Sequence, residues 1–328
     1  SYGGSITNCG NSGNVTGNST VGGICGWNQY GSLMNCSNSG NVTGKSVVGG
    51  ICGQSSGGSI TNCSNSGDVT SSGDNNVYIG GICGQNYNNE SISGNLTNCS
   101  NRGSVTGSGY VGGICGENDG SLTNCDNSGA VSGDDMIGGI CGYNYIASII
   151  SCSNSGSVTG SGKVGGICGY NQDGSITNCY WLATAYTGEG VGDGSGEATE
   201  KTEDEYKSGE VAWLLNQWQG NGAVDGKVWA VGDDGYPVLN GKSNNIVVKL
   251  TFNANTGNVE DQPIIRYANA GAALPSVEPP AREGYIFADW NTKQDGSGSS
   301  SVTTTPNENT TLYAQWIEVT LNQTNFTY

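Results

Sequence analysis

The hexapeptide Val21-Gly22-Gly23-Ile24-Cys25-Gly26 decides the fold, because it returns throughout the first half of the chain. The further copies begin at Val48, Ile79, Val111, Ile137 and Val164. A second motif, an Asn-Cys pair usually preceded by Ser-Ile-Thr or Ser-Leu-Thr, alternates with the first. Its cysteines are Cys9, Cys36, Cys63, Cys99, Cys125 and Cys179, with Ser151-Cys152 as the one variant. They lie 27, 27, 36, 26, 27 and 27 residues apart, so the chain repeats every 27 residues with one insertion in the third repeat.

The repeat itself predicts strands and turns. One unit reads SITNCxNSGxVTGxxxVGGICGxNxxG, in which short runs of Ile, Val, Thr and Cys are separated by turn residues. No window shows the helical spacing of apolar residues. A strand–turn unit of this size buries its apolar side only by stacking on its neighbours. We therefore predict a parallel β-solenoid, or β-helix, of six to seven coils over residues 1–180, with three strands per coil, around Ile6, around Val15 and around residues 21–25.

Two features of the repeat have structural explanations. The glycine pair at 22–23 recurs in every copy, which predicts a tight corner where no Cβ fits. One asparagine directly precedes the cysteine of the Asn-Cys motif, and another follows GGICG by two residues in most coils. Amide side chains at equivalent positions of stacked coils hydrogen-bond to one another. We expect two such ladders, one from Asn8 to Asn178 and one from Asn28 to Asn171, the second interrupted by Ser55.

Composition excludes several classes of function. The chain has 328 residues, a net charge of −17 and no histidine. Nucleic acids and anionic membranes are unsuitable partners, because their phosphates need clustered Lys and Arg. Histidine-dependent catalysis and histidine metal ligation are absent. No apolar run approaches the roughly 20 residues of a membrane span. Ser1 begins inside a repeat, so we expect an upstream coil or a processed export signal before it.

The pattern NCxNSGxVTGxxxVGGICGxN resembles the GLUG repeat of bacterial surface proteins, over about residues 1–180. The common form of that repeat has GGLVG where this chain has GGICG, and the change adds a second cysteine to each coil. The resemblance implies export and display at the cell surface. Some large relatives also carry peptidase domains, but no HExxH motif occurs here.

Composition changes after residue 180. Thr202 and Glu205 form a capping-box pattern, which predicts one helix over about 203–216. Tryptophans and tyrosines follow, up to Leu239. A helix and aromatic residues directly after the last coil predict a solenoid cap over 181–245, because the end of a solenoid leaves strand edges and core open. An aromatic platform for sugars is the alternative.

The last part of the chain has a second resemblance. Residues 246–252 alternate as a strand, and GYIFADW follows from Gly284 and LYAQW from Leu312. These segments resemble the Listeria–Bacteroides repeat of internalin-like surface proteins. Residues 255–257 depart from its glycine pair, and Asp289 replaces a glycine. The resemblance implies a small β-grasp-like module over 246–317. Residues 318–328 then form a terminal strand or the start of a truncated next module.

We expect no catalytic residues, no cofactor and no metal. The acids of the solenoid lie at non-equivalent positions of the repeats, whereas a glycosidase needs two carboxylates facing each other in a groove. Calcium at 134–135 or 233–234 is the alternative, but the calcium-binding nonapeptide repeat is missing.

Aromatic residues cluster at one corner of the predicted coil. The position after each GGICG holds Trp27, Gln54, Gln85, Glu117, Tyr143 and Tyr170. Aligned aromatics of this kind could stack on sugars or on a partner protein. Isolated surface aromatics at turns are the alternative. The candidate ligand-facing residues are Trp27, Tyr30, Tyr87, Tyr143, Tyr145 and Tyr170.

The cysteines leave two states open. An exported chain favours disulfides, whereas a dry core of reduced thiols is the alternative. Spacing does not choose between Cys9–Cys25 and Cys25–Cys36 pairing; we predict bridges between the two motif classes, with Cys9–Cys25 first. The disulfide candidates are Cys9, Cys25, Cys36, Cys52, Cys63, Cys83, Cys99, Cys115, Cys125, Cys141, Cys152, Cys168 and Cys179.

These observations favour a non-enzymatic extracellular or cell-surface protein, a structural stalk or an adhesin built on a β-solenoid. One alternative is a subunit of an extracellular filament, assembled through solenoid ends and the terminal strand. Another is a carbohydrate-binding or carbohydrate-active β-helix. The expected partners are glycans, host or cell-surface proteins, or further copies in a fibre, with no nucleic acid and no membrane insertion.

Overall fold

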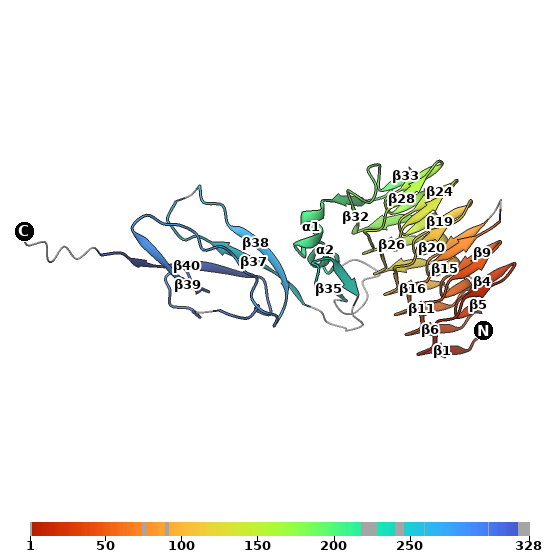
Figure 1. Cartoon of the computed structure of the whole chain (residues 1–328), viewed down its shortest axis with the longest axis horizontal. Coiled ribbons are helices and arrows are strands. Elements are labelled where there is room, and N and C mark those ends of the chain that lie inside the picture. The colour runs from red at the N-terminus through yellow and green to blue at the C-terminus, as the bar shows by residue number, and fades with distance from the viewer. Residues whose placement is uncertain are drawn as a thin grey trace, which may run out of the picture.

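The computed structural model describes residues 2–73, 77–88, 92–217, 228–239, 246–258, 260–300 and 302–320. Its first part is the predicted parallel β-solenoid, whose coils stack from the N-terminal end upward in Figure 1. Each of the first six coils contributes five short strands, not three. The difference arises because segments between the expected strands also pair with the neighbouring coils.

Five parallel sheets form the five walls of the solenoid, named here in chain order. The first wall holds β1 (Ser5–Thr7), β6 (Ser32–Met34), β11 (Ser59–Thr61), β16 (Asn95–Thr97), β21 (Ser121–Thr123), β26 (Ser148–Ile150) and β31 (Ser175–Thr177). The second wall holds β2 (Gly10–Asn11), β7 (Ser37–Asn38), β12 (Ser64–Asn65), β17 (Ser100–Asn101), β22 (Asp126–Asn127), β27 (Ser153–Asn154), β32 (Cys179–Leu182) and β34 (Ala198–Lys201).

The third wall holds β3 (Val15–Thr16), β8 (Val42–Gly44), β13 (Val69–Ser71), β18 (Val105–Thr106), β23 (Val131–Gly133) and β28 (Val158–Gly160). The fourth wall holds β4 (Thr20–Gly22), β9 (Val47–Gly49), β14 (Tyr78–Gly80), β19 (Tyr110–Gly112), β24 (Met136–Gly138) and β29 (Lys163–Gly165). The fifth wall holds β5 (Cys25–Gln29), β10 (Cys52–Ser56), β15 (Cys83–Tyr87), β20 (Cys115–Asn118), β25 (Cys141–Tyr145), β30 (Cys168–Gln172) and β33 (Val191–Gly194).

The core of the solenoid is a set of columns, one residue per coil. The GGICG isoleucines are fully buried from Ile51 onward, whereas Ile24 of coil 1 is half-buried because no described coil lies below it. They pack with the Ile and Leu residues of the first wall and with both classes of cysteine. Valines and isoleucines of the third and fourth walls form a separate cluster. Since each column repeats at the coil spacing of about 4.8 Å, the apolar surface is continuous along the rod.

The glycine pair lies at a corner with no room for a side chain, as predicted. A Cβ on Gly49 would lie 1.9 Å from the carbonyl oxygen of Cys52, and one on Gly50 would lie 2.1 Å from that of Gly81. The two expected asparagine ladders are also present. Asn62 donates to Asn35 at 3.2 Å, and Asn118 donates to Asn144 at 2.8 Å.

A third asparagine ladder, on the second wall, was not predicted. Its members from Asn38 onward are buried, and those from Asn11 to Asn127 donate both to the next coil and to a carbonyl oxygen two residues ahead. Asn101, for example, donates to Asn127 at 2.9 Å and to Gly103 at 2.8 Å. The sequence signal was the second Asn of NCxN, which recurs in every coil up to Asn154 and gives way to Trp181 in the next.

The solenoid continues beyond residue 180. Strand β33 pairs with β30 and strand β34 pairs with β32, so solenoid strands extend to Lys201. The Trp181 side chain is buried in the core at the position that asparagine holds in the earlier coils. It fills the space above Gly166, whose Cβ would lie 2.5 Å from the indole ring. Trp181 therefore closes this end of the core.

The predicted single helix is two helices, α1 (Glu203–Lys207) and α2 (Glu210–Leu215). The capping box at Thr202 and Glu205 is confirmed, but Gly209 takes a left-handed conformation with φ of 82° and breaks the helix. The helices lie beside the solenoid in Figure 1, not across its end. Tyr206 donates to the carbonyl oxygen of Tyr180 at 3.0 Å, and Trp229 donates to Asn124 at 3.3 Å. The cap thus covers the flank of the last coils.

The remaining strands form two small sheets. β35 (Trp229–Val231) and β36 (Pro237–Leu239) are an antiparallel pair next to α2. β37 (Val247–Asn253), β38 (Ile264–Asn269), β39 (Tyr285–Asn291) and β40 (Thr310–Glu318) form a mixed sheet in the order β38-β37-β40-β39. Its core includes Leu250, Phe252 and Leu312. The expected terminal strand at 318–328 lies outside the described residues from 321 onward.

Candidate binding face of the solenoid

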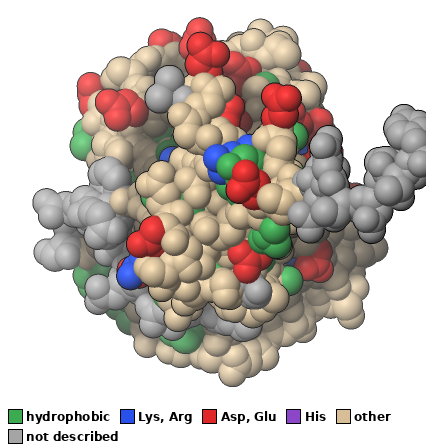
Figure 2. Space-filling view, turned by 90° about the vertical axis from the view of Figure 1, so that its left-hand side faces the viewer, with side chains coloured by type: hydrophobic (Ala, Val, Ile, Leu, Met, Phe, Trp, Pro, Cys, Tyr) green, Lys and Arg blue, Asp and Glu red, His purple; other side chains and the backbone are tan. Residues whose placement is uncertain are grey.

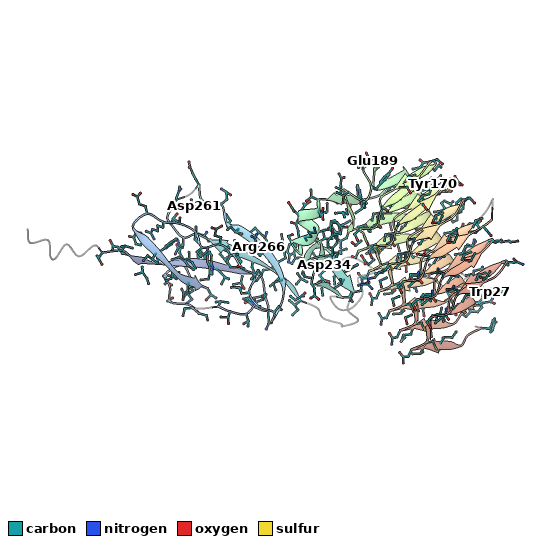
Figure 3. All side chains as sticks on the ribbon, in the orientation of Figure 1. Trp27, Tyr170, Glu189, Asp234, Asp261 and Arg266 are labelled. Carbon is teal, nitrogen blue, oxygen red and sulfur yellow. The ribbon has the colours of Figure 1, made fainter. Side chains whose placement is uncertain are left out.

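The candidate aromatic positions form one column on the fifth wall. Strand pairing aligns Trp27, Gln54, Gln85, Glu117, Tyr143 and Tyr170 in consecutive coils. Figure 3 shows Trp27 and Tyr170 at different heights of the solenoid, both on the side turned away from the C-terminal sheet. The alignment expected from the sequence is therefore present, and the cap does not cover it.

A second column, on the fourth wall, was missed. It holds the residue that precedes each Val/Ile-Gly-Gly-Ile-Cys-Gly motif, namely Thr20, Val47, Tyr78, Tyr110, Met136 and Lys163. The tyrosines of the two columns meet across the corner between the walls. Ring centroids lie 5.2 Å apart for Tyr78 and Tyr110, 5.5 Å for Tyr110 and Tyr143, and 5.4 Å for Tyr143 and Tyr170. We call Tyr78, Tyr110, Tyr143, Tyr145 and Tyr170 the tyrosine strip.

Polar side chains flank the tyrosine strip. Glu117 accepts hydrogen bonds from the Tyr87 hydroxyl at 2.9 Å and from the Gln85 amide at 2.7 Å. At the other end, the Lys163 ammonium lies 3.7 Å from the centroid of the Tyr170 ring and 2.6 Å from the Asp193 carboxylate. The strip is thus an apolar ridge bordered by hydrogen-bonding groups.

The electrostatic environment of the strip is acidic. Burial, the neighbouring Tyr170 and Glu117 raise the pKa of Tyr143 to about 12. Burial and the nearby Asp135 and Glu117 also raise the pKa of Tyr110. These phenols stay neutral at physiological pH, and the surrounding carboxylates give the face a negative potential.

The structure groups the six candidate aromatics unequally. Tyr143, Tyr145 and Tyr170 belong to the strip, with Tyr145 39% exposed. Tyr87 bonds to Glu117 in the neighbouring coil. Trp27, 52% exposed, and Tyr30 lie in coil 1, where the Tyr30 ring packs against Tyr2 at 5.7 Å. The candidates therefore divide into three members of the strip in coils 5 and 6, Tyr87 in coil 3, and a separate pair in coil 1.

A groove runs beside the strip on the third wall. It has a volume of about 580 Å³ and crosses coils 3 to 6. Hydroxyl groups and glycines line most of it, and Asp134 adds a carboxylate. The hydroxyls bridge neighbouring coils: Thr106 and Ser132 lie 3.0 Å apart, and Ser108 donates to the carbonyl oxygen of Gly73 at 2.7 Å. We call this feature the hydroxyl groove.

The thirteen cysteines are free thiols, arranged in two columns. Strand pairing aligns the GGICG cysteines from Cys25 to Cys168 in consecutive coils. The thiol of Cys25 interacts with that of Cys52 in the next coil. The structure contains no Cys9–Cys25 bridge, and thiols of one class face their own class along the rod.

Burial controls the chemistry of these thiols. Burial and the neighbouring Cys115 thiol raise the pKa of Cys83 well above its usual value, and burial together with Cys125 does the same for Cys99. Since the thiolate is the reactive form, these cysteines behave as core residues. Cys9 is the exception, because it lies exposed in coil 1.

Two acids share a small pocket that sequence reasoning did not anticipate. Asp119 and Asp173, expected at non-equivalent positions, both line a pocket of about 330 Å³ over coils 3 to 6. Burial, and secondly Glu117, raise the pKa of Asp119 to about 6. Among the described residues, no group of three or more His, Cys, Asp or Glu side chains could hold a metal ion. No described helix is long and apolar enough to cross a membrane.

Comparison with known families accounts for both parts of the chain. The GLUG motif matches residues 17–43, 44–70, 75–106, 135–159 and 160–184. The Listeria-Bacteroides repeat domain matches residues 249–315. The chain carries GLUG repeats followed by a Listeria-Bacteroides repeat domain. The resemblances noted in the sequence are thereby confirmed, and each GLUG repeat corresponds to about one coil of the solenoid.

A crystal structure from Bacteroides ovatus, provisionally named an immunoglobulin A1 protease, shares the fold of this GLUG-repeat protein. The TM-score is 0.52 at 22% sequence identity, over 71% of this chain and 75% of the other. At that identity the likeness concerns the fold alone. A search of curated protein sequences finds no match.

Proposed function

We propose that this chain is a non-enzymatic extracellular repeat protein, in which the GLUG solenoid is a rigid support for an adhesive face. The two repeat families and the β-solenoid neighbour support an extracellular repeat protein. The adhesive role rests on one observation, the tyrosine strip, in which rings from four consecutive coils make contact on a face that the cap leaves open.

The contrast between inward and outward columns supports this role. Inward columns are nearly constant, with isoleucine or leucine, cysteine and valine in every coil, because packing demands it. The outward columns of the fourth and fifth walls hold Tyr, Trp, Gln, Glu, Met, Lys, Thr and Val. Stability of the stack does not require aromatic residues at these outward positions, and aligned aromatics are typical of contact surfaces.

Adhesion is tested with fluorescent beads that carry the full chain, applied to bacterial and epithelial cells. We expect saturable binding that soluble chain competes away and that the double variant Tyr143→Ala/Tyr145→Ala weakens at least fivefold. Tyr285→Ala is the matched control, because it removes a ring from the C-terminal sheet, and it should leave binding unchanged. Beads that bind none of these cells above background would refute the adhesive role.

A further inference from the structure

We propose that the hydroxyl groove, together with the adjoining tyrosines of the fourth wall, binds a neutral linear polysaccharide. The proposal rests on the adhesive function above and names the class of partner. Three observations carry it: the shape of the groove, the order of polar and aromatic residues across it, and the charge around it.

The groove has the shape of a linear polymer site. Its lining comes from equivalent turns of four consecutive coils, so it runs along the rod and not around it. The same hydroxyl position recurs in three of these coils, at Thr106, Ser132 and Thr159, because strand pairing holds these residues in register, and Ser71 and Ser72 supply hydroxyls in the remaining coil. A repeating ligand thus meets the same donors and acceptors at each step of about 4.8 Å, a spacing close to the length of one sugar unit in an extended chain.

Aromatic residues of the fourth wall follow the polar lining of the groove along the chain. Ser108 lines the groove, and Tyr110 follows two residues later at the start of β19. Hydroxyls that bridge coils, as Thr106 and Ser132 do, keep further lone pairs for a ligand. A pyranose ring has a hydroxyl rim and apolar faces, so it can bond to the floor while packing against the ridge formed by Tyr78 and Tyr110, whose rings meet at 76°.

Charge selects against acidic polymers. Asp134 lines the groove, and the neighbouring Asp135 helps to raise the pKa of Tyr110. Lys163, beside the groove residue Ser161, is held in an ion pair with Asp193. Lys45 lies in the adjoining turn of coil 2, where its carbonyl oxygen accepts from Ser71. Carboxylated or sulfated glycans would be repelled by Asp134 and Asp135, which the single adjoining Lys45 offsets only in part, whereas a neutral chain avoids the repulsion.

The test measures binding of the full chain to soluble polysaccharides by affinity electrophoresis and calorimetry. The probes are mixed-linkage β-glucan, galactomannan and arabinoxylan as neutral chains, polygalacturonate and chondroitin sulfate as anionic chains, and chitosan as a cationic chain. We expect at least one neutral chain to bind, and its affinity to exceed that of both anionic polymers at least tenfold at physiological salt.

Two substitutions at one register position give a matched pair. Ser132→Trp fills the groove and should lower the affinity for the bound neutral chain at least tenfold. Thr16→Trp places the same ring at the equivalent exposed position of coil 1, outside the groove, and should leave the affinity within twofold. Thermal unfolding of both variants shows whether either substitution disturbs the fold. Tyr110→Phe should retain binding, and Tyr110→Ala should lose it.

The outcomes separate this proposal from the adhesive function. If no neutral polysaccharide binds, if an anionic polymer or chitosan binds more tightly, or if a folded Ser132→Trp variant binds unchanged, the polysaccharide proposal fails. Cell adhesion that survives glycosidase treatment and is lost after protease treatment points to a protein partner, and it also overturns the proposal while leaving adhesion intact. Absence of any cell adhesion overturns the adhesive function itself.

Discussion

At the residue scale, burial determines the chemical behaviour of the cysteines and of one aspartate. A cysteine in the middle of the rod is surrounded by Ile, Leu and further thiols, and it behaves as a small apolar residue. Cys9 has the same local motif but lies exposed at the first coil. An aspartate shows the same dependence. Asp126 occupies a position that is Ser in most coils, and the cap buries it to 9% exposure.

We predict that Cys9 alone reacts with a maleimide in the folded protein. The other twelve thiols are buried, and a buried thiol is shielded from the reagent. Mass spectrometry should show one adduct in the native chain and thirteen after denaturation without reductant. The Cys9→Ser variant is the control, with no native adduct. Fewer than thirteen adducts after denaturation would instead support the disulfides expected from export.

We predict that Asp126 makes stability fall between about pH 4 and pH 7. Burial raises its pKa from 3.8 to about 7, with Asp234 adding to the rise and Arg102 and Ser153 opposing it. Between these values the folded chain holds a proton that the unfolded chain releases, so rising pH favours unfolding. Asp126→Asn should match the parent near pH 3.5 and be more stable by about 1–3 kcal/mol at pH 8. Asp119 keeps a slope of the same sign in both proteins.

Urea unfolding at pH 3.5, 5.5 and 8 measures this effect. Parallel pH profiles for the parent and the Asp126→Asn variant would show that the Asp126 carboxyl is ionised in the folded protein. The cap would then admit water at that point.

At the element scale, ladders connect one coil to the next. The second-wall asparagines bond to each other and to a turn carbonyl in the coils up to Asn154, which fixes both the spacing and the turn that follows the Asn-Cys motif. The adjacent glycine corners leave no space for alternatives: a Cβ on Gly81 would lie 2.3 Å from the Asn101 amide carbon. Amide ladder and corner therefore depend on each other.

We predict that Asn101→Ala lowers the free energy of unfolding by about 2–3 kcal/mol, because it leaves buried amide and carbonyl groups of two neighbouring coils unpaired. Asn11→Ala, in the same column of coil 1, should have an effect below about 1 kcal/mol, since Asn11 bonds to only one coil at a half-exposed position. Urea unfolding of the three proteins decides the matter. Equal losses at the two positions would show that burial along the ladder does not matter.

At the scale of the whole molecule, the solenoid, the cap and the C-terminal sheet form one connected series in Figure 1. Asn269 of the sheet exchanges hydrogen bonds with the backbone of Val231 at 3.0 and 2.8 Å, and the Tyr267 ring packs against Trp213 at 5.5 Å. The end of the molecule seen in Figure 2 shows more acidic than basic side chains, in line with the net charge of −17. The binding face lies on the opposite flank of the solenoid, away from these contacts.

We predict that the chain cleaves no polysaccharide, even one that it binds. Asp119 and Asp173 line one pocket, but that pocket is separate from the hydroxyl groove, and no residue in it is a histidine. Reducing-end assays on the polysaccharides named above should stay at the level of a buffer blank over a day. Cleavage that disappears in the Asp119→Asn variant, with its fold retained, would establish an enzyme and contradict the proposed function.

The repeat period, the glycine corner and two of the three asparagine ladders follow from the sequence alone, because a parallel stack converts equal sequence positions into equal spatial positions. The tyrosines at 143, 145 and 170 were recognisable for the same reason. Features that combine residues from different columns could not be recognised from the sequence. The strip needs the corner between the fourth and fifth walls to bring Tyr110 to Tyr143, and the hydroxyl groove needs four turns to lie side by side.

Tertiary structure also decided which cysteines meet and where the cap lies. The number of residues from each cysteine to the next and to the previous one is nearly constant, so sequence spacing does not show which cysteines are in contact. The stacking of the coils shows it, because it places each thiol beside a thiol of its own class. The sequence pattern after residue 202 predicted one helix within a cap. In the structure Gly209 divides this segment into two helices, and the cap packs against the side of the last coils. The repeat period determines which residues align along the axis of the solenoid, whereas side-chain packing between walls determines which residues meet across a coil.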